Sequence, residues 1–230
     1  MENKKEEKIE LKEKNKTIKK GLKIIIIVLG IFLILLLVHS IRNYYIMANL
    51  EKNIQEYKNL NNFNMHLIGH EKNSAAKMEC NYYEKGDNTA LYIEKNYDGT
   101  KYKTSMYKDK TNTKEAEVFV DINDEPFEHS FGGAIDVKIT SLVAAENTAD
   151  RIINSIGTSI IPIKYEGKNC YKIINICSPN YFVKNKLIIE KDTGLTLEAE
   201  DENIKSKREY KFNNVDDKVF TKPDAIMYHK

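Results

Sequence analysis

The chain divides at Ile24–Val38, which reads IIIIVLGIFLILLLV and holds fifteen residues without a polar side chain. Three further residues extend this run to eighteen before Arg42. At roughly 1.5 Å per residue, a helix of that length spans about 27 Å, close to the hydrocarbon thickness of a membrane. We therefore expect a transmembrane helix over residues 24–42, although the mean hydropathy of the whole chain is only −0.53.

The lysines on the two sides of this run predict its orientation. Residues 1–23 carry nine Lys, whereas only Arg42 follows closely on the other side. The positive-inside rule then places residues 1–23 in the cytoplasm as a Lys/Glu-rich tail, and residues 43–230 outside the cell membrane. The tail is expected to be solvated, with a docking helix or a contact to anionic lipid as the alternative.

A cleaved signal peptide is the competing interpretation of the same run. Val38-His39-Ser40 could serve as a small-residue cleavage site. No A-x-A site follows the apolar run, and the charged segment before it is long for a signal peptide. An uncleaved, single-pass anchor is the interpretation favoured here.

Charge and cysteine content exclude several classes of protein. The chain has 36 basic and 34 acidic side chains, so it lacks the bulk positive charge on which many nucleic-acid-binding proteins depend. Its three Cys are too few for a disulfide scaffold. We expect no nucleic-acid partner.

Residues 43–230 have the length of one domain and change period along the chain. Ile46, Leu50, Ile54 and Tyr57 form one apolar stripe, which predicts an amphipathic helix over residues 43–60 that continues out of the membrane helix. Alternation of apolar and polar residues then predicts a meander of about five antiparallel strands, with examples at 63–67, 78–82, 102–106 and 116–120.

The second part of the domain resumes this pattern after an interruption. Residues 123–134 contain Pro126 and Gly132-Gly133 and are expected to form a loop, and residues 136–156 to form one or two helices that end at Gly157. Further strands are expected at 160–165, 170–176, 181–191, 195–200 and 206–212. The predicted class is α+β: a transmembrane helix, then a large curved antiparallel sheet of about ten strands with helices against one face.

The C-terminal half resembles the LolA/LolB-like superfamily of outer-membrane lipoprotein carriers. The resemblance rests on Tyr171-Lys172-Ile173, on the strand and turn from Lys186 to Leu195 with Asp192-Thr193-Gly194, on Tyr210-Lys211-Phe212, and on Phe220 and Pro223. Thr196 stands where the family often has Pro. The N-terminal anchor is more like the small membrane-anchored relatives in Gram-positive bacteria. The resemblance implies an incomplete barrel with helices in its concave side, an apolar cavity for lipid acyl chains, and no catalytic residues.

Polar candidates for chemistry are few. His66 and His70 are four residues apart, but on a strand their Cα atoms would lie about 13 Å apart, which disfavours a shared metal. Cys170 and Cys177 have opposite parity; a bond from Cys80 to one of them, or three small buried hydrophobes, are the alternatives. Since no catalytic, phosphate-binding or zinc motif is present, we expect a protein that is not an enzyme and uses no cofactor or metal.

One set of side chains suggests a ligand surface. Met and Tyr adapt to varied apolar shapes, and five of them are expected to share one side of the sheet: Met65, Met78, Tyr82, Tyr102 and Met106. Either they line a cavity for a lipid or another hydrophobic ligand, or they form ordinary core beneath the helices. The function predicted is noncovalent binding of such a ligand by a membrane-anchored domain. The alternative is an envelope sensor or adaptor that binds a protein and no ligand.

Overall fold

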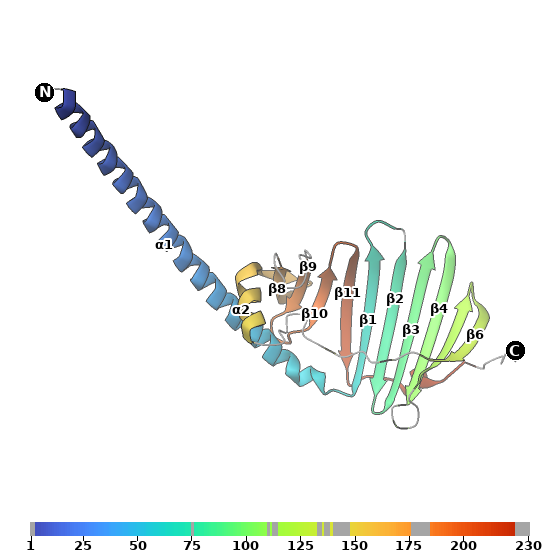
Figure 1. The fold of residues 1–230 in the computed structure, drawn as a ribbon. Coiled ribbons are helices and arrows are strands. Elements are labelled where there is room, and N and C mark those ends of the chain that lie inside the picture. The colour runs from blue at the N-terminus through green and yellow to red at the C-terminus, as the bar shows by residue number, and fades with distance from the viewer. Residues whose placement is uncertain are drawn as a thin grey trace.

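The computed structural model describes residues 3–74, 76–109, 111, 115–132, 135, 139, 148–175 and 185–223. It opens with one unbroken helix, α1 (Asn3–Lys58), which contains both the apolar run and the predicted amphipathic segment. Over Lys19–Tyr57 this helix is long and apolar enough to cross a membrane, and its most apolar stretch is not buried in the protein. Figure 1 shows α1 projecting far beyond the rest of the molecule, with only its C-terminal part beside the sheet.

Most of the other described residues form one open antiparallel sheet of eleven strands. Their order across the sheet is β6-β5-β4-β3-β2-β1-β11-β10-β9-β8-β7, so β11 returns to pair with β1 and joins the two halves. This architecture is consistent with an incomplete barrel, and the predicted fold class is confirmed. The strands are β1 (Asn62–Glu71), β2 (Lys77–Lys85), β3 (Asn88–Tyr97), β4 (Thr100–Asp109), β5 (Glu117–Ile122), β6 (Glu125–Phe131), β7 (Thr158–Tyr165), β8 (Lys168–Asn175), β9 (Asn185–Glu190), β10 (Thr196–Glu200) and β11 (Ile204–Phe212).

The prediction of a loop at residues 123–134 was wrong. Residues 123–134 were expected to be irregular because of Pro126, yet Glu125–Phe131 pairs with β5 as the edge strand β6. A proline lacks the backbone N–H that a central strand needs, but an edge strand leaves half of its N–H groups unpaired. The register shifts between Val120 and Asp121, next to the pair formed by Asp121 and Pro126. Proline here marks the edge of the sheet.

The C-terminal part of α1 packs on one face of the sheet, which we call the helix face. Met47 and Leu50 contact the β7–β10 half, and Ile54 contacts the centre. Leu50 and Ile54 are buried, as the apolar stripe predicts, and its other members, Ile46 and Tyr57, are partly buried against the same cores. Met47, which is not part of that stripe, is buried as well. Two residues from the segment between β6 and the next helix complete this layer by packing against the same core as Ile54: Ile135 and Ile139.

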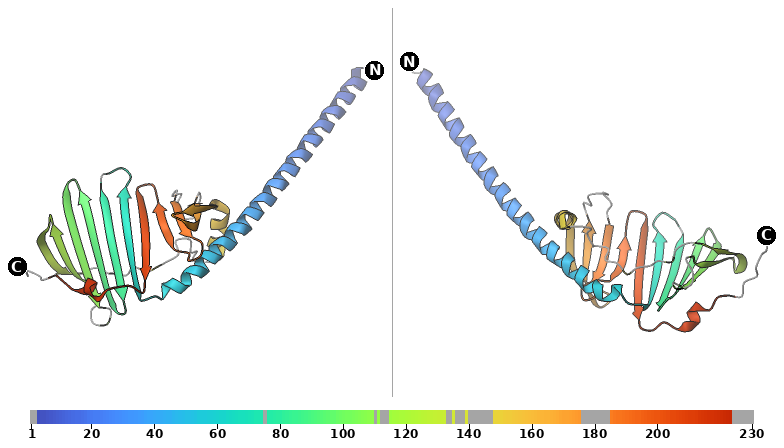
Figure 2. Two further views of the ribbon diagram at one scale, coloured as in Figure 1. Left: turned by 180° about the vertical axis from the view of Figure 1, so that it is seen from behind. Right: turned by 60° about the horizontal axis from the view of Figure 1, so that its bottom comes forward.

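Two short helices finish the fold. The first, α2 (Thr148–Gly157), lies against α1 (Figures 1 and 2) and ends at Gly157 as predicted; the first part of the predicted helical region, at residues 140–147, lies outside the described residues. The second, the 3₁₀ helix η1 (Asp217–Phe220), packs Phe220 against Ala90, Tyr107 and Phe119. These side chains have the opposite parity to the helix face, so η1 covers the other side of the sheet, which we call the outer face.

Candidate functional site

The strand register places all five candidate ligand-lining residues on the helix face. Met65 pairs with Tyr82, Tyr82 with Leu91, and Leu91 with Met106, which makes one row across β1–β4. Met78 pairs with Lys95 and Lys95 with Tyr102, which makes a second row four residues further along β2 and β4. Since side chains alternate between faces along a strand, both rows have the same orientation.

Burial divides these five residues into two groups. Met65 and Tyr82 are buried in the core beneath Ile54, and Met106 packs against that core, so these three serve as ordinary core. By contrast, Met78 is 38% exposed and Tyr102 is 37% exposed. The division follows which row is covered: Ile54 of α1, with Ile135 and Ile139, packs on the first row. The second row lies nearer the β1–β2, β3–β4 and β5–β6 turns.

An intermediate row joins the exposed residues into one surface. Leu67 pairs with Cys80, Cys80 with Ile93, Ile93 with Thr104, and Thr104 with Val120. All of these side chains are half-buried. Together with the second row they form what we call the open strip, whose apolar side chains are Leu67, Met78, Cys80, Ile93, Tyr102, Val120 and Ile122. The strip also contains Thr104 and, between Met78 and Tyr102, the exposed Lys95. Sequence reasoning did not name Ile93 as a candidate, although Leu91 and Ile93 alternate with Tyr92 and Glu94.

A cation stands at one end of the open strip. Arg208 on β11 pairs with Leu67, so its side chain belongs to the helix face beside the intermediate row. It donates a hydrogen bond to Tyr210, yet its Nε is buried and has no hydrogen-bond partner. Among the residues that the structure describes, no carboxylate forms an ion pair with it. Burial raises the pKa of Tyr210, and the neighbouring Arg208 acts in the opposite direction.

The described cysteines are not bonded to each other. Cys80 lies on the helix face, whereas Cys170 lies on the outer face in a cluster with Ile188 and Leu197, and both are free thiols. A Cys80–Cys170 disulfide is therefore excluded, and Cys177 lies outside the described residues. Burial raises the pKa of the Cys80 thiol to about 11, so it is protonated at neutral pH and acts as a small apolar side chain.

The outer face carries paired charges. His66 Nε2 lies 2.9 Å from Glu79 Oε1, and His70 is exposed further along β1, so the two histidines have separate surroundings. Glu198 is 5% exposed and is held by Lys186, Lys205 and the hydroxyl of Tyr165 at 3.1 to 3.3 Å. Hydrogen bonds from Lys186 and Lys205 lower the pKa of Glu198 against the opposing effect of burial. These contacts join β7, β9, β10 and β11, which indicates a structural role.

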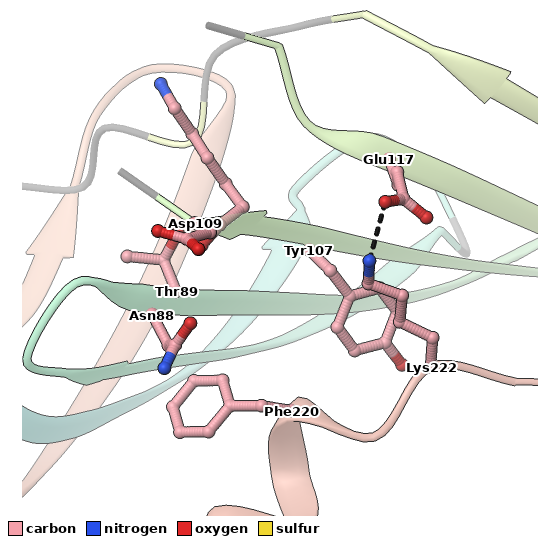
Figure 3. Close-up of a pocket in the computed structure, with 8 residues that line it drawn as sticks. Asn88, Thr89, Tyr107, Asp109, Glu117, Phe220 and Lys222 are labelled. Carbon is pink, nitrogen blue, oxygen red and sulfur yellow. Dashed lines mark hydrogen bonds and ion pairs between the residues drawn. The ribbon is translucent and has the colours of Figure 1, made fainter. Parts of the chain in front are cut away.

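A small pocket of about 190 Å³ lies where the C-terminal segment crosses the sheet (Figure 3). Phe220 and Tyr107 form part of its wall, and Lys222 donates to Glu117 at 2.6 Å across it. Asn88, Thr89 and Asp109 supply polar groups, and Asp109 already accepts hydrogen bonds from Thr111. The ion pair attaches the segment to β5. The pocket is too small and too polar for the hydrophobic ligand that the sequence predicts.

Comparisons with known proteins show a similarity of fold and nothing more specific. No family model matches the chain, and no curated protein does. Among solved structures, the crystal structure of MucB matches with a TM-score of 0.39 and 10% identity, over 76% of this chain and 62% of MucB. MucB in complex with MucA(peri) matches at 0.34 and 11%, over 75% and 58%. The LolA superfamily protein NE2245 from Nitrosomonas europaea matches at 0.26 and 13%, over 75% and 96%.

One of these neighbours, NE2245, is a member of the superfamily that the C-terminal motif resembles. The chain spans about three fifths of the length of MucB. At these identities the likeness is one of fold, so the molecule that this chain handles has to be inferred from its own contacts.

Proposed function

We propose that the chain is a membrane-anchored protein whose extracytoplasmic domain holds a lipid, or another hydrophobic ligand, noncovalently on the open strip. The observation that carries this proposal is the exposure of Met78 and Tyr102 among half-buried apolar neighbours. The same face is covered by α1 over its other half. In this proposal the ligand is bound and not chemically changed.

The size and composition of the open strip suit an acyl chain. From β11 to β5 the sheet takes five steps between strands, which is about 24 Å across the strip. One acyl chain spans half of the roughly 30 Å membrane core, so it fits within that length. Each buried methylene contributes about 0.8 kcal/mol. Flexible Met78 and the amphipathic ring of Tyr102 can adapt to chains of different shape.

Arg208 favours a ligand with an acidic head. Its guanidinium stands at the β11 end of the strip, and its Nε has no hydrogen-bond partner. A carboxylate or phosphate there would gain a charge-assisted hydrogen bond, while the acyl chain lies across β1–β5. The unbroken α1 helix supplies the anchor, because its exposed apolar run continues into the part that packs on the sheet.

The experiment is native mass spectrometry of the full chain, expressed in a bacterial host and extracted with a mild detergent. The test variant is Met78→Glu with Tyr102→Glu, which places two charges on the open strip. The matched control is Ile68→Glu, since Ile68 is half-buried on the outer face of the same hairpin and pairs with Lys207. All three proteins keep α1, so lipid that surrounds the membrane helix is common to them.

We expect a discrete adduct of lipid mass on the wild type and on Ile68→Glu, and its loss from the double variant. Circular dichroism must show that all three proteins are folded. If the wild type stays free of ligand after incubation with extracted lipids, lipid binding is wrong. The open strip would then be assigned to an apolar segment of a protein partner, which is the sensor or adaptor function.

A further inference from the structure

The short helix α2 carries an apolar face that is not used in packing against α1. Three isoleucines on it are exposed: Ile152 by 48%, Ile153 by 45% and Ile156 by 51%. At 100° per residue they lie within an arc of about 100°, on the side where Ala149 also lies. The contact with α1 is made from another direction, by the buried Ser155 and by Arg151. We call the three side chains the isoleucine face.

Hydrogen bonds fix the height of α2 along α1. Ser155 Oγ lies 2.7 Å from Ser40 Oγ, and the Thr158 carbonyl oxygen accepts from His39 at 3.0 Å and from Asn43 at 2.7 Å. The other end of α2 lies further from the apolar run, where Arg151 forms an ion pair with Glu51.

Two more contacts agree with this placement. The Arg151 guanidinium stands over the ring of Tyr44, 5.8 Å from its centre. Arg42 donates to the carbonyl oxygen of Ile160 at 3.2 Å, so the start of β7 lies at the same height as the C-terminal end of α2. The two helices are therefore antiparallel, and the C-terminal end of α2 lies beside His39–Asn43.

This height coincides with the end of the apolar run. Val38 is 60% exposed and Ile41 is 56% exposed, so α1 presents apolar side chains at the height of Ser155, on sides other than the polar one that contacts α2. Ile156 follows Ser155 directly, and Ile152 and Ile153 lie within one turn, or about 5 Å, of it. The isoleucine face thus begins where the hydrocarbon of a bilayer spanned by α1 would end.

The chain around this face is free of charge. Residues 152–163 read IINSIGTSIIPI, which contains six isoleucines and no ionisable side chain. The flanking charges, Arg151 and Lys164, stand outside this stretch, and Arg151 is already paired with Glu51. Charge is costly in the hydrocarbon but favourable among the headgroups, so an uncharged apolar stretch with Arg151 and Lys164 at its two ends suits the boundary between these layers.

We propose that the isoleucine face of α2 lies in the interface of the same bilayer that α1 crosses, so that the domain is seated on the membrane surface. This inference rests on the membrane anchor of the proposed function. The occupant is the lipid bilayer, because α1 and the hydrogen bonds at His39–Asn43 place the face at bilayer height. Seating would set β7 next to the membrane and leave β6, at the other edge of the sheet, furthest from α2 (Figure 2).

The absence of tryptophan from the chain makes a sharp test available, because one introduced tryptophan is the sole indole reporter. Full-length Ile153→Trp would be reconstituted in vesicles of phosphatidylcholine and phosphatidylglycerol, with and without brominated phosphatidylcholine, which quenches tryptophan on contact. Leu33→Trp, inside the apolar run, reports on the anchor. Ile204→Trp is the matched control, since Ile204 is also an exposed isoleucine, 45% accessible, but on β11.

We expect brominated lipid to remove about half of the emission of Leu33→Trp and of Ile153→Trp, and to leave Ile204→Trp unchanged. If Leu33→Trp is quenched and Ile153→Trp is not, the anchor stands and the seating of α2 is wrong. If Leu33→Trp is also unquenched, the anchor itself fails. Emission of Ile153→Trp that shifts to the blue with protein concentration, without quenching, would show that a second copy covers the face and would overturn the proposal.

Discussion

Gly194, in the turn between β9 and β10, lies directly against the carbonyl oxygen of Leu50 in α1. A Cβ at this position would overlap that oxygen and would stand 3.1 Å from the backbone nitrogen of Ile54. Gly194 also has φ of +72°, in the left-handed region that L-residues avoid. The turn motif Asp192-Thr193-Gly194 therefore has a structural purpose here, since it brings α1 down onto the sheet.

Gly194→Ala is expected to be strongly destabilising. The left-handed backbone alone costs about 1–2 kcal/mol with a Cβ, and the overlap with helix backbone should add at least about 2 kcal/mol. Gly99→Ala is the matched control, because Gly99 has φ of +79° and nothing within 4 Å of an added Cβ. Thermal unfolding followed by circular dichroism would compare the two, and equal losses of stability would contradict the contact with α1.

Asn43 is expected to hold α2 against α1. It is fully buried, and its Nδ2 donates to the carbonyl oxygens of Ser155 at 3.0 Å and Thr158 at 2.7 Å. Asn43→Ala leaves both acceptors without this donor, at a cost of about 1–3 kcal/mol. Amide hydrogen exchange in α2 should accelerate at least about tenfold. Ser40→Ala, which removes one hydroxyl at the same junction, should have the smaller effect, and the reverse order would contradict this role.

Glu200 makes stability depend on pH in the acid range. Hydrogen bonds from Lys72 and then Lys186 hold its pKa at about 2, below its ordinary value of 4.5. The lowered pKa means that the pairing stabilises the fold fully above about pH 4.5, and that this contribution is lost as the pH falls towards 2. Because the side chain is partly exposed, we expect no more than about 1 kcal/mol.

Urea unfolding of Glu200→Gln and the wild type would measure this dependence. The variant should be less stable at pH 6, and the two curves should converge near pH 2. Glu202→Gln removes the same charge from an exposed position two residues away and should follow the wild type throughout. A gap between Glu200→Gln and the wild type that is the same at both pH values would contradict the assigned pairing.

Tyr92 is expected to fasten the C-terminal segment to the outer face. Its hydroxyl donates to the carbonyl oxygen of Val219 at 2.5 Å and lies 3.1 Å from the hydroxyl of Tyr107. Tyr92→Phe should weaken this attachment by about 1 kcal/mol and raise trypsin cleavage after Lys218 about fivefold. Tyr83→Phe, whose ring packs edge-on against Tyr92, is the control, and equal cleavage of both variants would refute the assignment.

The period of apolar residues predicted most of the architecture. Alternation in β1, β2, β4 and β5, and the stripe of Leu50 and Ile54, follow directly from burial of one face of each element. The edge strand β6 was missed because Pro126 normally ends a strand, and only the sheet order shows that β6 lies at the edge, where the N–H that proline lacks is not required. The alternation of apolar and polar residues along a strand does not indicate whether that strand lies at the edge or in the centre of a sheet.

The candidate site was less accessible from sequence. Parity placed Met65, Met78, Tyr82, Tyr102 and Met106 on one face correctly, because register in a meander preserves it. Which of them are covered depends on where α1, Ile135 and Ile139 cross that face. Arg208 has the same parity as Tyr210 and Phe212, but nothing local distinguishes it from the charged residues of a solvated strand. Contacts between segments that are distant in sequence determine both which of the five residues are covered and where Arg208 lies.

The unbroken course of α1 has a mechanical consequence. A carrier that shuttles needs either no tether or a flexible one. Here the helix that contains the apolar run also contributes side chains to the core of the domain. From Asn43 to Lys58 the helix continues for about 24 Å without a hinge. With α1 in a bilayer as proposed, the domain would be held at one height and one tilt. A ligand of the proposed kind would then have to reach the domain at that position, and a rotation of the helix in the membrane would rotate the whole sheet with it.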